Sequence, residues 1–378
     1  MPLPVKVLIA PDKFKGSLSA VAAAGAISRG VLAGWPGAQV QMAPIADGGE
    51  GFAEAMCEAL RGEWVELPAQ DPLGREVQAR YAWVESMKLA VLEMSEASGI
   101  WRLSRAELSP MNAHTFGTGQ LIRHAIERGA QTLLVGLGGS ATTDGGVGMA
   151  NALGFEFLDA NGSGLDPRPF NLRTLAAIRP RTGPALPQIL AACDVQNPLL
   201  GDRGTALVFS PQKGAGAAEA AALEEGMENL ARVVHRDLGC DFRDTPGAGA
   251  AGGIGFGLMS FCGAEIRSGF DVVAEALRLD AMVREADLVI TGEGRIDGQT
   301  LEGKGPAGVA QLARAAGKPV IALAGAVSED PALYQIFDAL APIVDQPLTL
   351  EDAMGRGAEL LERAAQRAVR FLQIGTHL

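Results

Sequence analysis

The sequence predicts an α/β protein of two domains, and three observations support this. Short apolar runs of strand length alternate with longer segments of helical period, glycine-rich turns join them, and aromatic side chains are scarce. The chain has 378 residues, of which 48% are hydrophobic, 5% are aromatic and 49 are glycine. A chain of this length favours two domains, and alternating strands and helices favour parallel sheets with right-handed crossovers.

Two strand–loop–helix units open the chain. Residues 5–10 form an apolar run and residues 18–34 have helical spacing, with Ser17 placed to cap the helix. Residues 40–45 repeat the pattern and lead through a glycine-rich turn into a helix that begins at Phe52. Two such units in succession predict a parallel sheet whose carboxyl edge carries ligand-binding loops.

The pattern changes near residues 66–69, where we place a domain boundary. Residues 77–84 and 89–94 are typical of two antiparallel strands joined by a polar turn. Residues 161–187 are rich in proline, glycine and arginine, which predicts an irregular connection. We expect further strands at residues 132–135, 189–192 and 206–209, and helices that end near residue 128, cover 149–153 and end near residue 238.

The parallel-strand pattern returns at residues 287–291. Further strands are expected at 319–323 and 339–344, and helices ending at 316 and covering 350–372. The simplest topology is therefore discontinuous. Residues 1–68 and 285–378 form a Rossmann- or flavodoxin-like domain with a parallel sheet, and residues 69–284 form an inserted mixed α/β domain.

The glycine-rich stretch 136–148 is a candidate ligand site, because it lies between an apolar strand and a short helix. Glycine lets backbone N–H groups approach a ligand, and a helix start adds unpaired N–H groups, so the stretch suits a phosphate or a carboxylate. A tight turn that needs glycine only for packing explains the stretch equally well, and neither common nucleotide motif is matched. The candidate ATP-binding residues here are Gly138, Gly139, Ser140, Thr142, Asp144 and Gly145.

A second glycine-dense stretch covers residues 246–257 and contains Gly249 and Gly252. The apolar residues inside it are unlike those of a solvated linker. This favours a loop lying close under a ligand over a flexible connection.

Charged residues gather at the expected strand ends and glycine turns. Carboxylates beside such loops, with a few cations, suit a magnesium–nucleotide centre. For Asp12 and Lys15 an ordinary solvated pair, and for Asp47 a helix cap, stay open. Only His114 of the four histidines is expected in a loop, so a hydrolase triad is poorly supported. The charged set comprises Asp12, Lys15, Asp47, Glu50, Asp144, Asp194, Lys213, Glu293, Arg295, Asp297 and Lys304.

Composition excludes several classes of protein. A net charge of −12 argues against a general nucleic-acid binder. The four cysteines are far apart and form no CxxC pair, which favours reduced thiols and a cytoplasmic protein. Because residues 1–7 lead directly into an expected strand, we expect no signal peptide, and no apolar run is long enough to span a membrane. The residues alone leave a kinase, a nucleotide-linked dehydrogenase and a non-enzymatic binder open.

Taken together, the motifs resemble the bacterial glycerate kinase family, and the resemblance extends over nearly the whole chain. Four positions differ from the family's usual pattern: Lys13, His114, Thr143 and Gln196. The matching runs are residues 10–12, 14–20, 46–51, 110–112, 117–119, 136–142, 144–146, 192–195, 197–199, 211–214, 246–253 and 291–300.

The resemblance implies phosphorylation of D-glycerate with ATP and Mg²⁺, in the cleft between two α/β domains. We expect the 2-hydroxyl to react and give 2-phosphoglycerate, with 3-phosphoglycerate as the alternative product. The rival functions are a nicotinamide-linked hydroxyacid reductase and a glycerate-binding sensor. Nucleotide preference and oligomeric state, monomer or homodimer, stay open.

We assign roles to the polar residues on this basis. Asp194 is the expected general base, because it follows a strand end. Asp297, with Glu293, is expected to hold Mg²⁺. Lys15 and Arg295 are expected to hold the glycerate carboxylate or the transferring phosphoryl group. The remaining substrate-binding candidates are Asp12, Asp47, Asn112 and Lys213.

Overall fold

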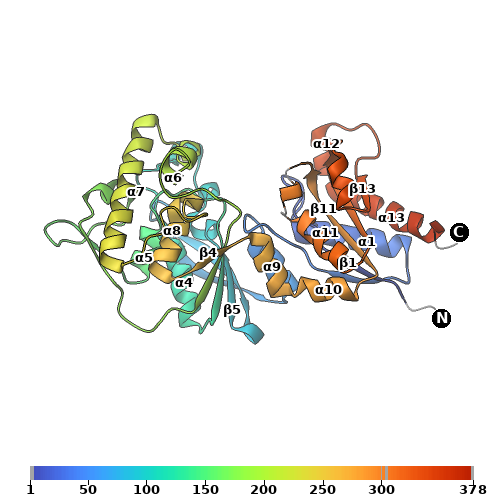
Figure 1. Ribbon diagram of the computed structural model, residues 1–378, viewed down its shortest axis with the longest axis horizontal. Helices are drawn as coiled ribbons and strands as arrows, with labels where there is room; N and C mark the ends of the chain where they lie inside the picture. Colours follow the sequence, from blue (N-terminus) through green and yellow to red (C-terminus); the bar gives the residue numbers. More distant parts are fainter. Residues whose placement is uncertain (1–3, 299, 303–304, 376–378) are drawn as a thin grey trace. The chain divides into compact units, whose positions relative to one another are not determined.

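The computed structural model describes residues 4–298, 300–302 and 305–375, so Lys304 lies outside the described residues (Figure 1). The chain forms two compact units. Unit 1 contains Met1–Asp47, Glu54–Arg61 and Phe270–Leu378, and unit 2 contains Gly48–Ala53 and Gly62–Gly269. The sequence placed the boundaries near residues 68 and 285, whereas the contacts place them after Arg61 and Gly269.

Unit 1 is built on a five-stranded sheet with the order β13-β12-β11-β1-β2, in which every pairing is parallel. This confirms the parallel sheet expected from the strand–helix alternation. The strands are β1 (Lys6–Ile9), β2 (Gln39–Met42), β11 (Leu288–Ile296), β12 (Val320–Val327) and β13 (Ala339–Pro342).

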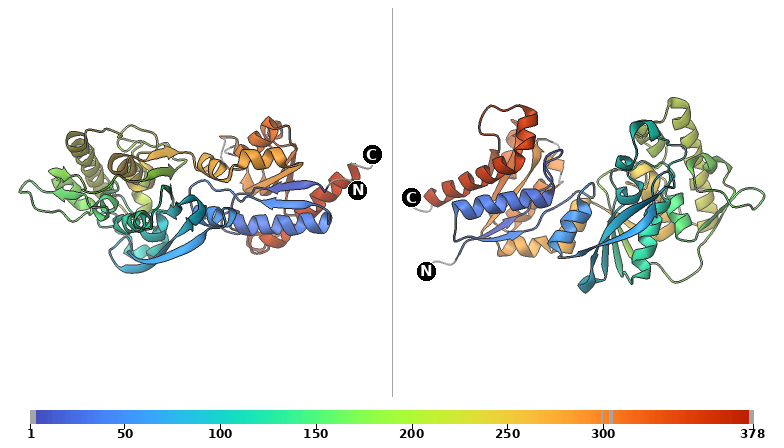
Figure 2. Two further views of the ribbon diagram at one scale, coloured as in Figure 1. Left: turned by 90° about the horizontal axis from the view of Figure 1, so that it is seen from below. Right: turned by 180° about the vertical axis from the view of Figure 1, so that it is seen from behind.

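Helices α1 (Ala20–Gly34) and α13 (Gly357–Gly375) lie side by side in unit 1 (Figure 2). Both contribute to the core that covers the Val7 and Ile9 side of the sheet. A Cβ at Gly30 would lie 2.1 Å from the carbonyl oxygen of Glu362, so the close approach of the two helices requires glycine there. The other helices assigned mainly to this unit are α2 (Phe52–Ala59), α9 (Gly269–Leu277), α10 (Leu279–Glu285), α11 (Pro306–Ala315) and α12 (Leu350–Gly355).

Two expectations for unit 1 are wrong in detail. Ser19, and not Ser17, caps α1, because its hydroxyl accepts a hydrogen bond from Ala22 N at 3.2 Å. The Ser17 hydroxyl donates instead to the carbonyl of Met354 at 2.6 Å. The single helix expected over 350–372 is two helices, α12 and α13, because the chain leaves helical geometry at Arg356.

Unit 2 is built on a six-stranded mixed sheet with the order β10-β9-β6-β5-β4-β3. The β4–β5 pair is antiparallel, as expected, and β3 adds a second antiparallel pairing, while the other pairs are parallel. Residues 66–69, where the sequence suggested a boundary, lie inside β3. The strands are β3 (Glu63–Gln70), β4 (Glu76–Val84), β5 (Leu89–Glu93), β6 (Thr132–Gly136), β9 (Gln188–Ala192) and β10 (Glu265–Arg267).

The segment expected to be irregular, 161–187, contains β8 (Ala177–Arg179), which pairs with β7 (Glu156–Leu158). The strand expected at 206–209 is wrong, because residues Thr205–Phe209 form helix α6. A four-residue apolar run has no decisive period, and tertiary packing decides its structure. The other helices of unit 2 are α3 (Ser95–Ser98), α4 (Phe116–Glu127), α5 (Val147–Ala152), α7 (Ala217–Leu238) and α8 (Ala250–Cys262).

No helix among the described residues is both long and apolar enough to cross a lipid bilayer. The four cysteines are present as thiols.

Candidate active site

The carboxyl edge of the sheet in unit 1 collects four carboxylates. Beyond the end of β1, Ala10 N donates to Ile290 O and Asp12 N donates to Gly292 O, both at 2.8 Å. These bonds continue the pairing with β11 and place Asp12 beside Glu293. Asp47 follows β2, which also pairs with β1, and Asp297 follows directly on β11. The sequence placed Glu293 and Arg295 in a turn. In the structure both belong to β11, where their backbones pair with residues 324 and 326 of β12.

Glu293 has the most altered acidity of this group. Burial raises the pKa of its carboxyl to about 7, and the charges of Asp12, Asp297 and Asp47 raise it further, against a hydrogen bond from the Thr300 hydroxyl at 2.9 Å. A carboxyl surrounded by three others gains from a nearby cation, which would restore its charged form.

The neighbouring cations are distributed over the same edge. Lys13 Nζ lies 3.0 Å from Asp47 Oδ1, and Arg295 Nε lies 3.1 Å from Asp297 Oδ2. The side chain of Lys15 is exposed, and its backbone N lies 3.3 Å from the position a Cβ would take at Gly294. The structure therefore brings the predicted cations Lys15 and Arg295 to the edge that carries the carboxylates.

Within the described residues, no group of three or more His, Cys, Asp or Glu side chains is arranged to hold a metal ion. A ready-made metal cage of protein ligands is therefore absent from this part of the chain. Mg²⁺ commonly takes only one or two carboxylates and completes its shell with phosphate oxygens and water. The carboxylates at this edge fit that second arrangement.

The carboxyl edge of unit 2 carries the glycine-rich stretch, which we call the glycine loop (residues 137–146). Leu137 N donates to Ala192 O at 3.1 Å, so the loop leaves β6 beside the end of β9. Asp194 follows β9 at the same edge, and its Oδ1 accepts a hydrogen bond from Gly269 N at 3.1 Å. Two predicted features, the loop and Asp194, thus lie at one edge of one sheet.

Asp144 stabilises the glycine loop from inside the protein. Its carboxylate is fully buried and accepts four hydrogen bonds, from Thr115 N, Thr115 Oγ1, Gly146 N and Gly148 N, at 2.7–3.1 Å. The sequence assigned Asp144 to ATP binding. In the structure both of its oxygens accept hydrogen bonds from the loop backbone and from Thr115. Asp144 therefore influences the site by holding the backbone of the loop in place.

The second glycine stretch packs directly on the first. Ala251, Gly252 and Gly253 have φ of 51°, 79° and 84°, which interrupts α8 with a kink near its start. Gly145 N donates to Gly252 O at 3.0 Å, and a Cβ at Gly252 would lie 1.8 Å from Thr142 O. The expectation of a loop throughout 246–257 is wrong from Ile254 onward, where the chain is helical. The close contact explains Gly252, because no other residue fits the φ and the space.

Two hydroxyls of the glycine loop have no partner among the described residues. The side-chain oxygens of Thr142 and Thr143 are buried and make no hydrogen bond there. Lys213 is 1% exposed, and its Nζ donates to Thr142 O at 2.6 Å. Burial lowers the pKa of Lys213 to about 7, against the opposing effect of Asp144. Unpartnered buried hydroxyls are costly, so they indicate a ligand or water that supplies acceptors.

Asn112 and His114 lie on the loop that precedes α4. Asn112 is half-buried and its Nδ2 donates to Ser109 Oγ at 2.9 Å. His114 is 4% exposed, burial lowers its pKa, and its Nδ1 accepts a hydrogen bond from Phe116 N at 3.3 Å. The side chain of His114 is therefore held inside unit 2 by its own loop.

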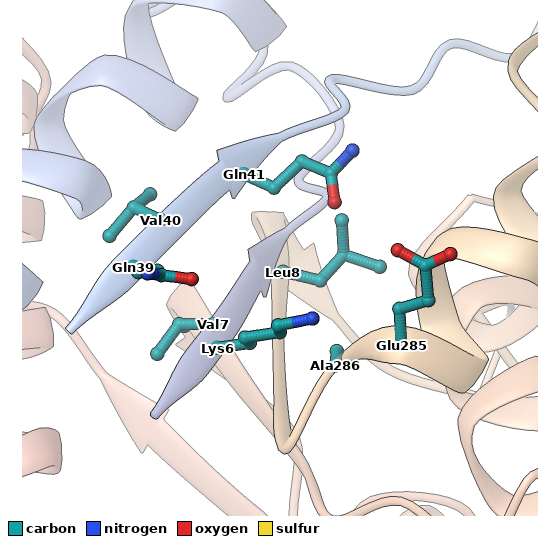
Figure 3. A pocket seen from close by; sticks show the side chains of 8 residues that line it. All are labelled: Lys6, Val7, Leu8, Gln39, Val40, Gln41, Glu285 and Ala286. Carbon is teal, nitrogen blue, oxygen red and sulfur yellow. The ribbon is translucent and has the colours of Figure 1, made fainter. Parts of the chain in front are cut away.

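A cavity of about 250 Å³ lies elsewhere in unit 1, on the face of the sheet formed by β1 and β2 (Figure 3). The predicted site residues that the structure describes do not line it. Gln39 and Gln41 alternate with Val40, a pattern that signals a strand with one polar face but does not announce a cavity. The lining residues are Lys6, Val7, Leu8, Gln39, Val40, Gln41, Glu285 and Ala286.

Comparison with known proteins identifies the family. A family model described as the glycerate kinase family matches residues 7–373. The chain belongs to the glycerate kinase family.

Individual members are similar over their full length. Glycerate kinase of Bacillus subtilis (strain 168) is 44% identical over 371 residues, covering 96% of each chain. Glycerate 2-kinase of Escherichia coli (strain K12) is 41% identical over 378 residues, covering 98% of this chain and 99% of that protein. A crystal structure described as glycerate kinase 2 from Salmonella typhimurium LT2 has a TM-score of 0.90 at 42% identity, covering 99% of this chain and all of that one.

Membership of the glycerate kinase family makes the chain a kinase, and family and fold therefore agree on an α/β phosphotransferase. Backbone N–H groups of a glycine-rich loop generally suit phosphate oxygens, and clustered carboxylates generally suit a divalent cation.

Proposed function

We propose that this chain transfers the γ-phosphoryl group of ATP to D-glycerate, at the 2-hydroxyl, and releases 2-phosphoglycerate and ADP. Family membership is the observation that carries the proposal, and the similarity to a protein named glycerate 2-kinase favours the 2-hydroxyl. The cations at the carboxyl edge of the sheet in unit 1 and the backbone donors at that of unit 2 are suited to binding small anionic substrates. We place the enzyme in the cytoplasm, because that reducing compartment keeps cysteines as thiols, and its four cysteines are thiols.

The glycine loop is the proposed site of the ATP phosphates. The support is the pair of unpartnered hydroxyls that the described chain presents at Thr142 and Thr143, together with backbone exposed at Gly139. Backbone N–H groups and hydroxyls are the usual partners of phosphate oxygens. The proposed ATP-binding residues remain Gly138, Gly139, Ser140, Thr142, Gly145, Gly249 and Gly252, with Asp144 acting through the loop it holds.

Glu293 and Asp297 are the proposed magnesium ligands. The support is the position of Glu293, where burial first and the charges of Asp12, Asp297 and Asp47 second raise its pKa, so that a nearby cation would favour its charged form. When bound, Mg²⁺ neutralises charge on the phosphate oxygens that it contacts. The protein's own part is to hold Glu293 in β11 and Asp297 directly after it, with Asp12 beside Glu293 beyond the end of β1.

Asp194 is the proposed general base. Its carboxylate would accept the proton of the 2-hydroxyl while that oxygen bonds to the γ-phosphorus and ADP leaves as the bond to the β–γ bridging oxygen breaks. The hydrogen bond from Gly269 N holds one carboxylate oxygen in place. Lys15 and Arg295 would pair with the glycerate carboxylate or the transferring phosphoryl group, and Asp12, Asp47 and Asn112 would contact the substrate.

The direct test is ADP release coupled to NADH oxidation, with purified protein, ATP, Mg²⁺ and D-glycerate. We expect ADP release that requires D-glycerate and is absent with L-glycerate or without metal. A hydroxyacid reductase would instead change NAD(P)H absorbance without ATP, and a sensor would bind glycerate and release no ADP. Either of those results would contradict the proposal.

A further inference from the structure

Lys213 is the one predicted substrate ligand whose surroundings point to another role. We infer that Lys213 is a positioning residue of the glycine loop, whose ammonium fixes the peptide between Thr142 and Thr143 for an anionic ligand on its other side. The inference deepens the proposed function, since it rests on the placement of ATP phosphates on this loop.

Lys213 is too deeply buried to contact a bound substrate directly. It ends the short helix Pro211–Lys213, its side chain is 1% exposed, and its Nζ donates to Thr142 O at 2.6 Å. Burying an ammonium group is costly unless it is paired, and an apolar side chain would fill the same space at a lower cost in free energy. Filling space therefore does not explain a lysine here. What the ammonium adds is its hydrogen bond to the carbonyl of Thr142.

The carbonyl of Thr142 is held from two sides. Lys213 Nζ donates to it, and the backbone of Gly252 approaches so closely that a Cβ there would lie 1.8 Å from the same oxygen. Gly252 O in turn accepts from Gly145 N at 3.0 Å. The position of the Thr142–Thr143 peptide is therefore set by contacts from both glycine stretches and from Lys213.

A trans peptide directs its C=O and its N–H to opposite sides, and the described chain contains no cis peptide bond. Donation to Thr142 O therefore directs the N–H of Thr143 away from Lys213. A charged donor on the carbonyl also polarises the peptide and strengthens that N–H as a donor. The hydroxyls of Thr142 and Thr143, which have no partner within the described chain, flank the same peptide that Lys213 helps to hold.

Few charges act on Lys213. Asp144 of the glycine loop is the charged group that raises its pKa, while burial lowers the pKa to about 7. Helix α6 contains no titratable side chain, and α8 contains only Cys262, whose pKa burial raises to about 12. The proton on Lys213 is therefore gained and lost near neutral pH, and a bound polyanion on the loop would favour its retention.

The first experiment follows Lys213 in the wild-type protein by NMR of ¹³Cε- and ¹⁵N-labelled lysine, with and without ATP and Mg²⁺. We expect one lysine to titrate near pH 7, and its pKa to rise when ATP binds, because binding and protonation favour each other. A lysine that titrates at its ordinary pKa, or one whose pKa does not change on ATP binding, would overturn the inference.

The second experiment compares ATP affinity by calorimetry between pH 6 and pH 9 in wild type, Lys213→Met and Lys88→Met. Lys88 is a partly exposed lysine of unit 2 and serves as the matched control. We expect Lys213→Met to bind ATP about fivefold or more weakly at pH 6. The difference should shrink toward pH 9, while Lys88→Met follows wild type. ATP itself changes protonation over this pH range, but it does so equally for all three proteins, so its effect cancels in the ratio of their affinities.

Hydrogen exchange separates the two possible failures. If ATP protects residues 138–148 in wild type but Lys213→Met matches wild type in affinity at every pH, the inference fails and the phosphate placement stands. If ATP does not protect these residues, the phosphate placement itself fails and the inference falls with it. Faster exchange of the loop in ligand-free Lys213→Met than in wild type would support the positioning role.

Discussion

At the scale of single residues, burial and hydrogen bonds give chemically similar groups different roles. Asp144 and Glu293 both lie at a strand edge, yet Asp144 accepts four hydrogen bonds inside unit 2, whereas Glu293 lies among other carboxylates with a pKa raised to about 7. The first is suited to holding a loop and the second to meeting a cation. Sequence position alone does not distinguish them.

Asp194→Asn tests the general base. Asparagine keeps an oxygen for the hydrogen bond from Gly269 N but cannot accept the substrate proton. We expect kcat to fall about 10²–10⁴-fold with little change in KM for ATP. Asp159→Asn, a substitution in a turn of the same unit, should leave kcat unchanged. Turnover of Asp194→Asn near the wild-type level would remove Asp194 from the chemistry.

Glu293→Gln and Asp297→Asn test the magnesium site. Losing one of two carboxylate ligands should raise the Mg²⁺ concentration for half-maximal activity about tenfold, and should weaken Mn²⁺ binding measured by electron paramagnetic resonance in the presence of ATP. Asp287→Asn lies just before the amino end of β11 and is the control. An unchanged metal requirement in both variants would place the metal elsewhere.

At the scale of elements, the sequence predicted the strand, glycine loop and helix around residues 132–153 because apolar period and glycine content agree there. It failed at α6, where the four-residue run 206–209 has no decisive period, and at β11, where Gly292 and Gly294 suggested a turn. The strand continues because both glycines stay paired or packed against neighbouring backbone, at Leu323 and at Phe14. Such pairing depends on distant parts of the chain.

Gly252→Ala tests the contact between the two glycine stretches. The residue has a φ of 79° and no space for a Cβ beside Thr142 O, so alanine must displace the loop. Gly239→Ala is the matched control, since Gly239 has a φ of 73° and no described atom lies within 4 Å of its Cβ position. We expect the control to lose about 1–2 kcal/mol of stability from backbone strain alone.

Gly252→Ala should lose more than the control and should also weaken ATP binding, because Thr142 would move. Urea denaturation and calorimetry measure the two effects. Equal losses of stability in the two variants, with unchanged ATP affinity, would mean that the glycine contact does not shape the site.

At the scale of the whole molecule, each unit places its candidate residues at the carboxyl edge of parallel strands. The sequence could predict this, because strand ends and glycine turns are local features. It could not predict that Lys213 is buried on a loop carbonyl, or that Lys13 pairs with Asp47, because residues far apart in the chain make these contacts. The cavity beside β2 was missed for the same reason.

The pH dependence of stability tests the burial of Lys213. Its pKa is about 7 in the folded protein and near 10.5 in the unfolded chain, so the unfolded state binds more protons between those values. The free energy of unfolding should therefore rise from pH 7 to pH 9 in wild type relative to Lys213→Met, by on the order of a few kcal/mol. Parallel urea-denaturation profiles for the two proteins would show that Lys213 is not buried as a titrating group.

The identity of the product tests the proposed phosphorylation of D-glycerate most sharply, and ¹H–³¹P correlation NMR identifies it after incubation of the protein with ATP, Mg²⁺ and D-glycerate. In wild type we expect ADP and a phosphorus coupled to the single C2 proton, as in 2-phosphoglycerate. In Asp194→Asn both should appear far more slowly. Coupling of the phosphorus to the two C3 protons, or ADP without any phosphorylated glycerate, would contradict the proposal.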